Sequence, residues 1–205
     1  MNNEPRNICQ DFLKNLDLFI ANNLDTLTCA DVYNIYSNFY MDLKQFKGNS
    51  SGFTGLSEYT IFRIFYHLLG GNFEPKQITN DLYDFRSPDG RFRIGQSTPI
   101  IAGSRKYYPD IQIFKDDSLL MICEIKLYLT YGIKTLENDI QKLAEINKEY
   151  PGTKGLFISY NTIPIKGKIY RKLLDEERSK VWLNYLILHD NNQSIKKILE
   201  KIIFE

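Results

Sequence analysis

The stretch 110–126 constrains the fold more than any other part of the chain, because it has the pattern of a β-hairpin with charged residues on one face. Two apolar runs, IQIF and LLMICEI, flank the polar, turn-forming residues KDDS. Side chains alternate between the faces of a strand, so Glu124 and Lys126 project together while Ile125 points the other way. An apolar strand gains nothing obvious by burying a glutamate and a lysine, which indicates a functional pair.

The expected register of this hairpin brings two acids together. With a three-residue loop, Asp116-Asp117-Ser118, Asp110 lies directly opposite Glu124 on the same side of the sheet. Directly opposed residues have Cβ atoms roughly 4.5–5.5 Å apart, a gap that suits two carboxylates sharing one small divalent cation. Oxygen ligands lie about 2.0–2.1 Å from Mg²⁺. We therefore expect a metal-binding pair of carboxylates, with Lys126 standing one pleat further along.

Pro109-Asp110, thirteen intervening residues and then Glu124-Ile125-Lys126 resemble the signature of the PD-(D/E)XK nuclease superfamily. That group has the restriction-endonuclease-like fold and includes restriction enzymes, Holliday-junction resolvases and several viral and repair nucleases. The resemblance implies a metal-dependent DNA nuclease, a phosphodiester hydrolase, in which Asp110, Glu124 and the backbone carbonyl of Ile125 hold Mg²⁺, with Mn²⁺ able to substitute. It also implies that Lys126 orients the attacking water or neutralises charge in the transition state.

The resemblance also implies a fold class. The expected fold is α/β, with a restriction-endonuclease-like core, an α-β-β-β-α-β mixed sheet flanked by helices, an N-terminal helical extension and a C-terminal α-β-α addition. The flexible sequence KGNSSG marks the boundary between an extension at 1–50 and a nuclease-like domain at 51–205. The resemblance itself covers roughly residues 53–160.

Periodicity and turn residues place the elements along the chain. Helices are expected at 7–22, from Thr28 onward with Asp31 completing a capping box, at 55–69, at 135–150, at 169–179 and around 195–203. Strands are expected at 91–101, at 155–160 and at 181–188, whereas 72–90 reads as loop and short structure ending in a β-turn. The helix at 135–150 makes a parallel crossover the natural connection to 155–160.

One acid of the helix at 55–69 is also a candidate ligand. This helix is apolar nearly all round, so it is expected to be buried, and Glu58 lies on the same stripe as Phe62 and Phe65. A buried carboxylate needs a cation or a proton. The resemblance implies that Glu58 joins the metal site, where it would serve a second ion. The alternative is a first-turn glutamate favoured by the helix dipole, and the sequence leaves both open.

Basic and polar residues near the hairpin are candidates for binding nucleic acid. Residues 86–106 carry a local excess of four positive charges leading to Asp110, and among them Arg93, Arg105 and Lys106 are interpreted as gripping phosphates. The alternative is a solvated strand face. On the helix at 135–150, Gln141 and Lys142 fall near the edge of the apolar seam. The resemblance implies that this helix supplies a polar or basic residue to the site, and Gln141 is the candidate. A glutamine followed four residues later by tyrosine marks one branch of the superfamily, but Gln141 is followed by Glu145, so that motif is incomplete.

Composition and charge bound the class of protein. A chain of 205 residues with 43% hydrophobic and 14% aromatic residues can build a full core. The formal net charge of +1 gives no global attraction to nucleic acid, so a DNA-binding surface has to be local. His67 and His189 stand alone, which argues against a zinc site or a histidine-based triad. Three scattered cysteines, no signal peptide and no apolar run of membrane length lead us to expect a cytoplasmic protein with no membrane partner.

The same residues leave other functions open. The chain could keep the nuclease fold without its chemistry, as a catalytically silent DNA-binding or complex-forming protein, although all three signature charges are present. It could instead be an unrelated α/β protein whose hairpin charges form a structural ion pair. Modest size and the lack of a sequence-reading motif favour structure-selective or general DNA cleavage. Whether the protein acts as a homodimer, as resolvases and many restriction enzymes do, stays open.

Overall fold

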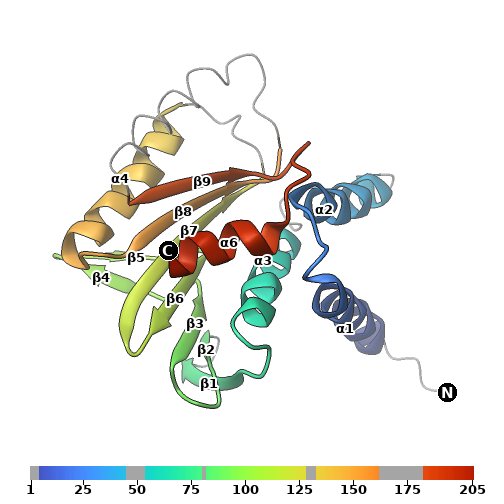
Figure 1. Ribbon diagram of the computed structural model, residues 1–205, viewed down its shortest axis with the longest axis horizontal. Helices are drawn as coiled ribbons and strands as arrows, with labels where there is room; N and C mark the ends of the chain where they lie inside the picture. Colours follow the sequence, from blue (N-terminus) through green and yellow to red (C-terminus); the bar gives the residue numbers. More distant parts are fainter. Residues whose placement is uncertain (1–4, 45–53, 80–81, 128–132, 162–181) are drawn as a thin grey trace.

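The computed structural model describes residues 5–44, 54–79, 82–127, 133–161 and 182–205, which form a mixed α/β fold (Figure 1). In chain order the elements are α1 (Pro5–Asn23), α2 (Cys29–Lys44), α3 (Thr54–Leu68), β1 (Glu74–Thr79), β2 (Leu82–Arg86), β3 (Phe92–Gln96), β4 (Ile100–Ala102), β5 (Arg105–Tyr107), β6 (Ile111–Lys115), β7 (Ser118–Lys126), α4 (Ile133–Glu149), β8 (Lys154–Ser159), β9 (Leu183–Ile187) and α6 (Ile195–Phe204). The α/β class expected from the sequence is confirmed.

A seven-stranded sheet with the order β1-β2-β3-β6-β7-β8-β9 forms the centre of the described residues. The first five strands in this order pair antiparallel, whereas β7-β8 and β8-β9 pair parallel. Helix α4 makes the crossover from β7 to the parallel strand β8, as predicted. Strands β4 and β5 form a separate two-stranded sheet.

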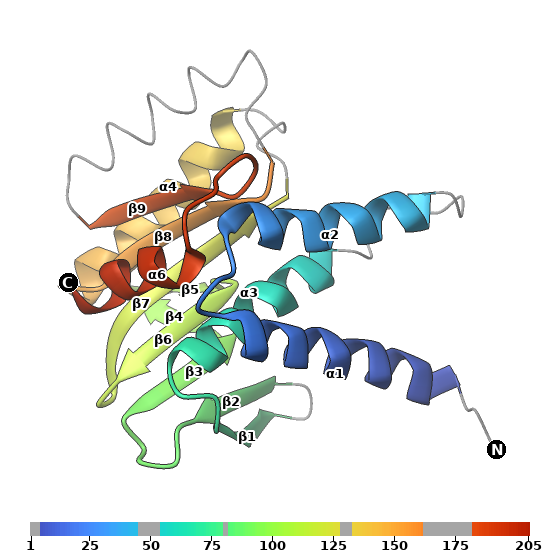
Figure 2. The same ribbon diagram turned by 45° about the vertical axis from the view of Figure 1, so that its right-hand side comes forward.

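Two hydrophobic cores lie on opposite faces of the sheet. On one face, α1, α2, α3 and α6 pack against strand residues such as Ile113 and Ile158. On the other face, α4 and the β4–β5 hairpin pack against Ile122 and Phe157. Successive side chains of a strand point to opposite faces of the sheet, so neighbouring residues are buried in different cores. Figure 2 shows α1, α2 and α3 gathered on the side of the sheet away from α4.

The N-terminal helices share the larger core with the sheet. Leu16 and Ile20 of α1 and Val32 of α2 are buried in it. A polar contact between α1 and α3 adds to this packing, because the Asp17 carboxylate pairs with both Arg63 and His67 of α3. Helices α1 and α2 therefore hold α3 against the sheet.

The hairpin of β6 and β7 has the predicted register but not the predicted loop. Its turn has two residues, Asp116 and Asp117, both with positive φ (49° and 63°), the conformation of a type I′ turn. The expected three-residue loop was wrong. A β-bulge follows the turn, where Leu120 of β7 is the extra residue between two successive pairs. The bulge restores the expected pairing, with Ile111 opposite Cys123.

Two further predictions differ from the structure for identifiable reasons. Residues 72–90, expected to be loop and short structure, contain the paired strands β1 and β2, which were not expected because β1 is polar and contains Pro75. Proline is tolerated in an edge strand, and β1 is the edge of this sheet. Residues 91–101 are not one strand, because Ser97 has a positive φ (50°) and Pro99 cannot donate to a ladder.

The other predicted elements agree with the structure where it describes them. Thr28 and Asp31 form the expected capping box, in which each backbone N–H donates to the other's side chain. Gly70 and Gly71, both with positive φ, end α3. The helix predicted at 169–179 lies outside the described residues. None of the described helices combines the length and the apolar character needed to cross a lipid bilayer.

Candidate functional site

The candidate site lies where β6 and β7 part. Strand β6 begins at Ile111, whereas β7 continues to Lys126, so Asp110 stands just outside the ladder. Its carboxylate takes the place of a strand partner: Oδ2 accepts a hydrogen bond from the Ile125 backbone N–H at 2.6 Å. The N–H and C=O of one strand residue point to the same neighbouring strand, so the Ile125 carbonyl also faces Asp110.

Glu124 is the buried acid of the site. Its side chain is 2% exposed and lies on the sheet face that α4 covers. One carboxylate oxygen, Oε1, forms an ion pair with Lys142 of α4, and Oε2 lies 3.6 Å from the Lys126 ammonium. The structure thus brings Asp110, Glu124 and Lys126 to one end of the sheet.

Burial makes both carboxyls of the pair poor acids, and the charge of Asp110 adds to this effect at Glu124. Burial, followed by the charge of Asp110, raises the pKa of Glu124 to about 7, against the opposing effect of Lys142 and Lys126. Burial also raises the pKa of Asp110, although the Ile125 N–H and the two lysines lower it. Two carboxyls held this way favour a bound cation, because positive charge relieves the repulsion and replaces lost hydration.

Lys126 is held more closely by α4 than by its own strand. Its ammonium lies 3.1 Å from Asp139 Oδ2, compared with 3.6 Å from Glu124 Oε2. Burial is the largest single influence and lowers the pKa of Lys126, but the charges of Asp139, Glu124 and Asp110 together raise that pKa above its ordinary value. Lys126 is therefore a fixed positive charge rather than a free base.

Glu58 reaches the same end of the sheet from α3, on the opposite face. Burial and then the charge of Asp110 raise the pKa of Glu58, whereas a side-chain hydrogen bond with Gln96 and the charge of Lys126 lower it. Helix α3 begins at Thr54 and has no acid in its first turn, so the helix-dipole explanation of Glu58 was wrong. The inward-facing alternative places Glu58 within electrostatic reach of the pair.

The residues present fit a divalent ion bound by two carboxylates. Within the described ranges, no three His, Cys, Asp or Glu side chains come together as a metal-binding group. The candidate metal site therefore consists of Asp110, Glu124 and the Ile125 carbonyl, with Glu58 further away. The Lys142 ammonium beside Glu124 shows that this position accepts positive charge. Oxygen ligands of this kind suit Mg²⁺, which usually keeps several waters.

Comparison of the chain with models of protein families, with curated proteins and with solved structures found no significant match.

The two charged residues that α4 supplies were not assigned to the site from the sequence: Lys142 was placed near the edge of the apolar seam without a role, and Asp139 was not considered. Asp139 and Lys142 are three residues apart and therefore lie on one helix face, where they meet Lys126 and Glu124. Their position beside the apolar seam was the available signal. Gln141, the residue assigned from this helix, is instead exposed and donates to Glu145 Oε1 at 3.1 Å.

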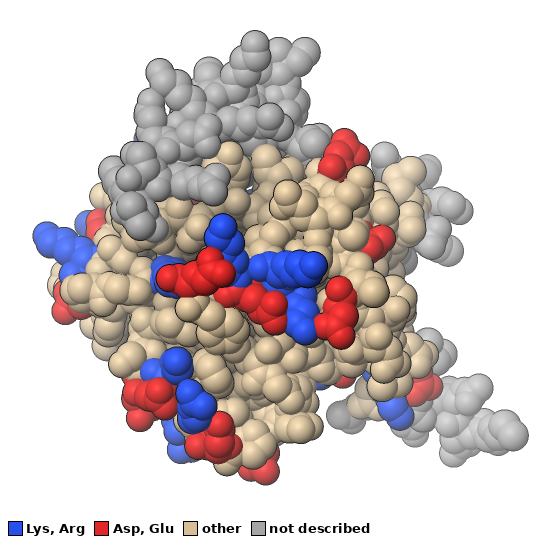
Figure 3. All heavy atoms as spheres, in the orientation of Figure 1, with Lys and Arg blue, Asp and Glu red and all other residues tan. Residues whose placement is uncertain are grey.

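The candidate phosphate-binding residues are divided between two places. Arg93 donates to the buried Asp84 at 2.9 Å and its guanidinium lies 3.4 Å from the centre of the Phe114 ring, so its charge is already used within the fold. Arg105 and Lys106 are exposed on β5. In Figure 3, Lys and Arg side chains are interspersed with Asp and Glu, so the face shown has no broad basic surface.

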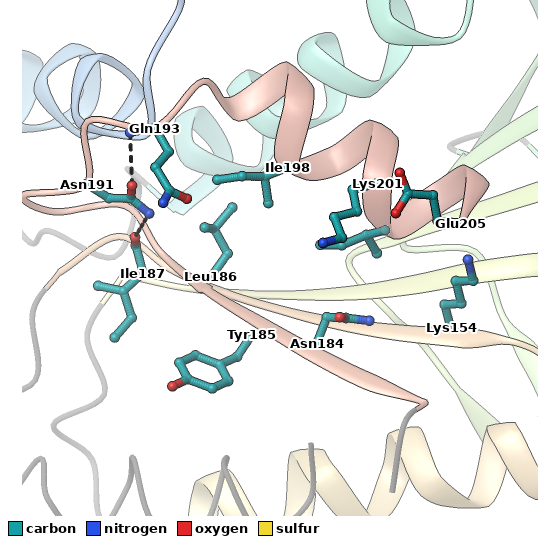
Figure 4. Close-up of a pocket in the computed structure, with 11 residues that line it drawn as sticks. Lys154, Asn184, Tyr185, Leu186, Ile187, Asn191, Gln193, Ile198, Lys201 and Glu205 are labelled. Carbon is teal, nitrogen blue, oxygen red and sulfur yellow. Dashed lines mark hydrogen bonds between the residues drawn. The ribbon is translucent and has the colours of Figure 1, made fainter. Parts of the chain in front are cut away.

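A separate hollow of about 710 Å³ lies between β9 and α6 (Figure 4). Amide side chains and opposite charges line it, among them Asn184, Gln193, Lys201 and Glu205. Asn191 shapes one end, because its amide donates to the Ile187 carbonyl at 3.2 Å and its oxygen accepts from the Gln193 N–H at 3.1 Å. None of the paired carboxylates described above lines this hollow.

The raised pKa of Glu124 predicts a pH dependence of stability. The folded protein holds the Glu124 proton more tightly than the unfolded chain, whose pKa is near 4.5, so stability should fall as pH rises through about 7. Between about pH 5.5 and about pH 8 the loss should be about 2 kcal/mol. Asp17 and Asp31 have a lowered pKa and titrate below this window, whereas Asp110 and Glu58 have a raised pKa and add a loss of the same sign. Urea unfolding with a metal chelator at both pH values measures the change.

The matched variant for this measurement is Glu124→Gln. It has no ionisable group at position 124, so its stability should vary less over the same pH range. A flat profile for the natural protein, or an unchanged dependence in Glu124→Gln, would contradict the assignment of the effect to this carboxyl.

Proposed function

We propose that this protein is a metal-dependent DNA nuclease that hydrolyses phosphodiester bonds with Mg²⁺ held by Asp110, Glu124 and the Ile125 carbonyl. One observation carries the proposal: Asp110 accepts the Ile125 N–H where β6 and β7 part, beside the buried Glu124. A partly buried carboxyl, a buried carboxyl and a lysine thereby meet at the free end of a strand pair. A structural ion pair alone would need only one of the two acids.

The order of the elements supports a restriction-endonuclease-like core. With β1-β2 and β4-β5 set aside, the remaining elements from α3 to β8 are α3, β3, β6, β7, α4 and β8, which is the α-β-β-β-α-β order of the PD-(D/E)XK superfamily. The three antiparallel strands and the parallel β8 make the mixed sheet that this resemblance implies. In this assignment, β1 and β2 extend one edge, β9 extends the other, and β4-β5 is an insertion before Asp110.

The roles of the residues follow from their charge and position. A divalent ion bound there would polarise the scissile phosphate and lower the pKa of a bound water. Asp110 and Glu124 supply the negative charge that holds it. Lys126, fixed by Asp139, keeps an ammonium beside the site to orient the attacking water or to stabilise negative charge on the phosphate. Glu58, whose pKa responds to the charge of Asp110, would serve a second ion.

DNA would approach over the exposed strand β5. Arg105 and Lys106 lie there, in the hairpin that leads to Asp110, and Arg105 Nη1 is 3.6 Å from Glu145 of α4. Such a loose, exposed ion pair is easily exchanged for a phosphate contact. With few exposed basic residues at the site, phosphate contacts should contribute little affinity, and affinity should fall only shallowly as salt increases.

A cleavage assay tests the proposed function. Linear duplex, single-stranded and four-way-junction DNA are incubated with Mg²⁺, with Mn²⁺ and with a chelator. We expect cleavage with either ion and none with the chelator. The DNA that is cleaved fastest then distinguishes a general nuclease from one that is selective for single-stranded or branched DNA. Specific DNA binding without cleavage in any ion would favour the silent nuclease-fold protein instead. The absence of both would contradict the proposal.

A further inference from the structure

Helix α4 places opposite charges against the two charged residues of β7. Asp139 lies 3.1 Å from the Lys126 ammonium, and Lys142 forms an ion pair with Glu124 Oε1. The two α4 residues are three positions apart, so they form one face of the helix turned toward the sheet. Each candidate catalytic charge on β7 thus has its own counter-charge on α4.

The Lys142 ammonium contacts Glu124 and lies within electrostatic reach of Asp110, the two acids proposed to share a metal ion. Glu124 is almost fully buried, its Oε2 is 3.6 Å from Lys126, and its Oε1 is in contact with Lys142. A carboxylate oxygen in direct contact with an ammonium has little room for a metal ion at the same lone pairs. Lys142 is on a long, flexible side chain that is 20% exposed, so it can move away.

We infer that Lys142 is an internal cation that neutralises Glu124 in the metal-free protein and leaves it when a divalent ion binds. Metal and lysine then compete for one carboxylate. The inference rests on the proposed metal site and adds to it a residue that tunes metal affinity. It also explains how the fold holds the buried Glu124 beside Asp110 without a metal, because an unpaired buried charge is strongly destabilising.

Competition has opposite consequences for metal binding and for stability. Without the ammonium, a metal ion meets a carboxylate that has no ion pair to break, so affinity should rise. Without the ammonium, the metal-free protein also holds an uncompensated acid, so its melting temperature should fall. A lysine that helps to build the metal site would instead make affinity fall when it is removed.

The test is calorimetric titration of the full chain with Mn²⁺ for the natural protein and for Lys142→Met. The variant should bind Mn²⁺ at least about tenfold more tightly, which corresponds to about 1.4 kcal/mol. Its metal-free melting temperature should be lower, and saturating Mn²⁺ should raise that temperature more than in the natural protein. Lys148→Met is the matched control, because it removes the same charge from an exposed position of the same helix and should bind Mn²⁺ as the natural protein does.

A second variant keeps the test decisive if Lys142→Met does not fold. Lys142→Gln retains a hydrogen-bond donor without the charge, and it should also bind Mn²⁺ more tightly. Equal or weaker binding in the variants, with binding by the natural protein intact, would overturn the inference and leave the proposed function standing. Failure of the natural protein and of the variants to bind Mn²⁺ would overturn both. Tighter binding by the variants with no nuclease activity in the natural protein would overturn the proposed function alone.

Discussion

Replacing Glu124 by glutamine should lower Mg²⁺-dependent DNA cleavage by roughly a thousandfold or more, because the variant loses a charged ligand of the ion that stabilises the transition state. Glutamine has nearly the same shape and is neutral, like the protonated carboxyl that a pKa near 7 already permits in the folded protein. The variant should therefore fold. Initial rates of cleavage, together with circular dichroism of each sample, measure both properties.

The companion variants and a control separate chemistry from structure. Asp110→Asn and Lys126→Ala should each lose cleavage and keep most DNA binding. Glu74→Gln removes an exposed carboxylate from β1, the far edge of the sheet, and should leave the cleavage rate within about twofold. Full activity in Glu124→Gln would contradict the assignment. Unfolding of all three site variants would indicate that the charges are structural.

Replacing Phe65 by alanine should reduce the free energy of unfolding by about 3–5 kcal/mol. Phe65 is 0% exposed and lies on α3, which is packed between the N-terminal helices and the sheet. Truncation removes buried apolar area and leaves a cavity that rigid neighbours fill only in part. Urea unfolding followed by circular dichroism gives the value.

The control for this prediction is another phenylalanine. Phe204 at the end of α6 is 54% exposed, so Phe204→Ala should change stability by less than about 1 kcal/mol. A loss below about 1 kcal/mol for Phe65→Ala would mean that α3 is not part of a close-packed core. Such a result would also remove the support that holds Glu58 near the site.

The acidic pair was predictable because it depends on local pairing. Strand alternation and a short turn are enough to predict that Asp110 lies opposite Glu124. The loop is one residue shorter than expected, but a β-bulge in β7 restores the register, and no local feature of the sequence predicts that bulge. Strands β1 and β2 were missed because an edge strand needs less apolar character than an inner one. The break after β3 depends on one left-handed residue, Ser97, which is an unusual conformation for serine.

The rest of the site depends on packing between distant elements. Asp139 and Lys142 contact β7 only because of the rotation of α4 about its own axis as it packs on the sheet. The apolar seam in the sequence predicts which side of the helix faces the sheet only to within one or two residues. Gln141 sits next to Lys142 in sequence and points to solvent for the same reason. Arg93 was assigned to phosphate because its buried partner, Asp84, belongs to a strand that the sequence analysis did not find.

The most direct test of the metal site is a crystal structure of the protein with Mn²⁺, using the anomalous scattering of the ion to locate it. We predict one strong peak between the Asp110 and Glu124 carboxylates, about 2.1 Å from an oxygen of each and from the Ile125 carbonyl, with Lys142 moved off Glu124. A saturated crystal with no peak at this position, and with Lys142 still paired to Glu124, would contradict the account.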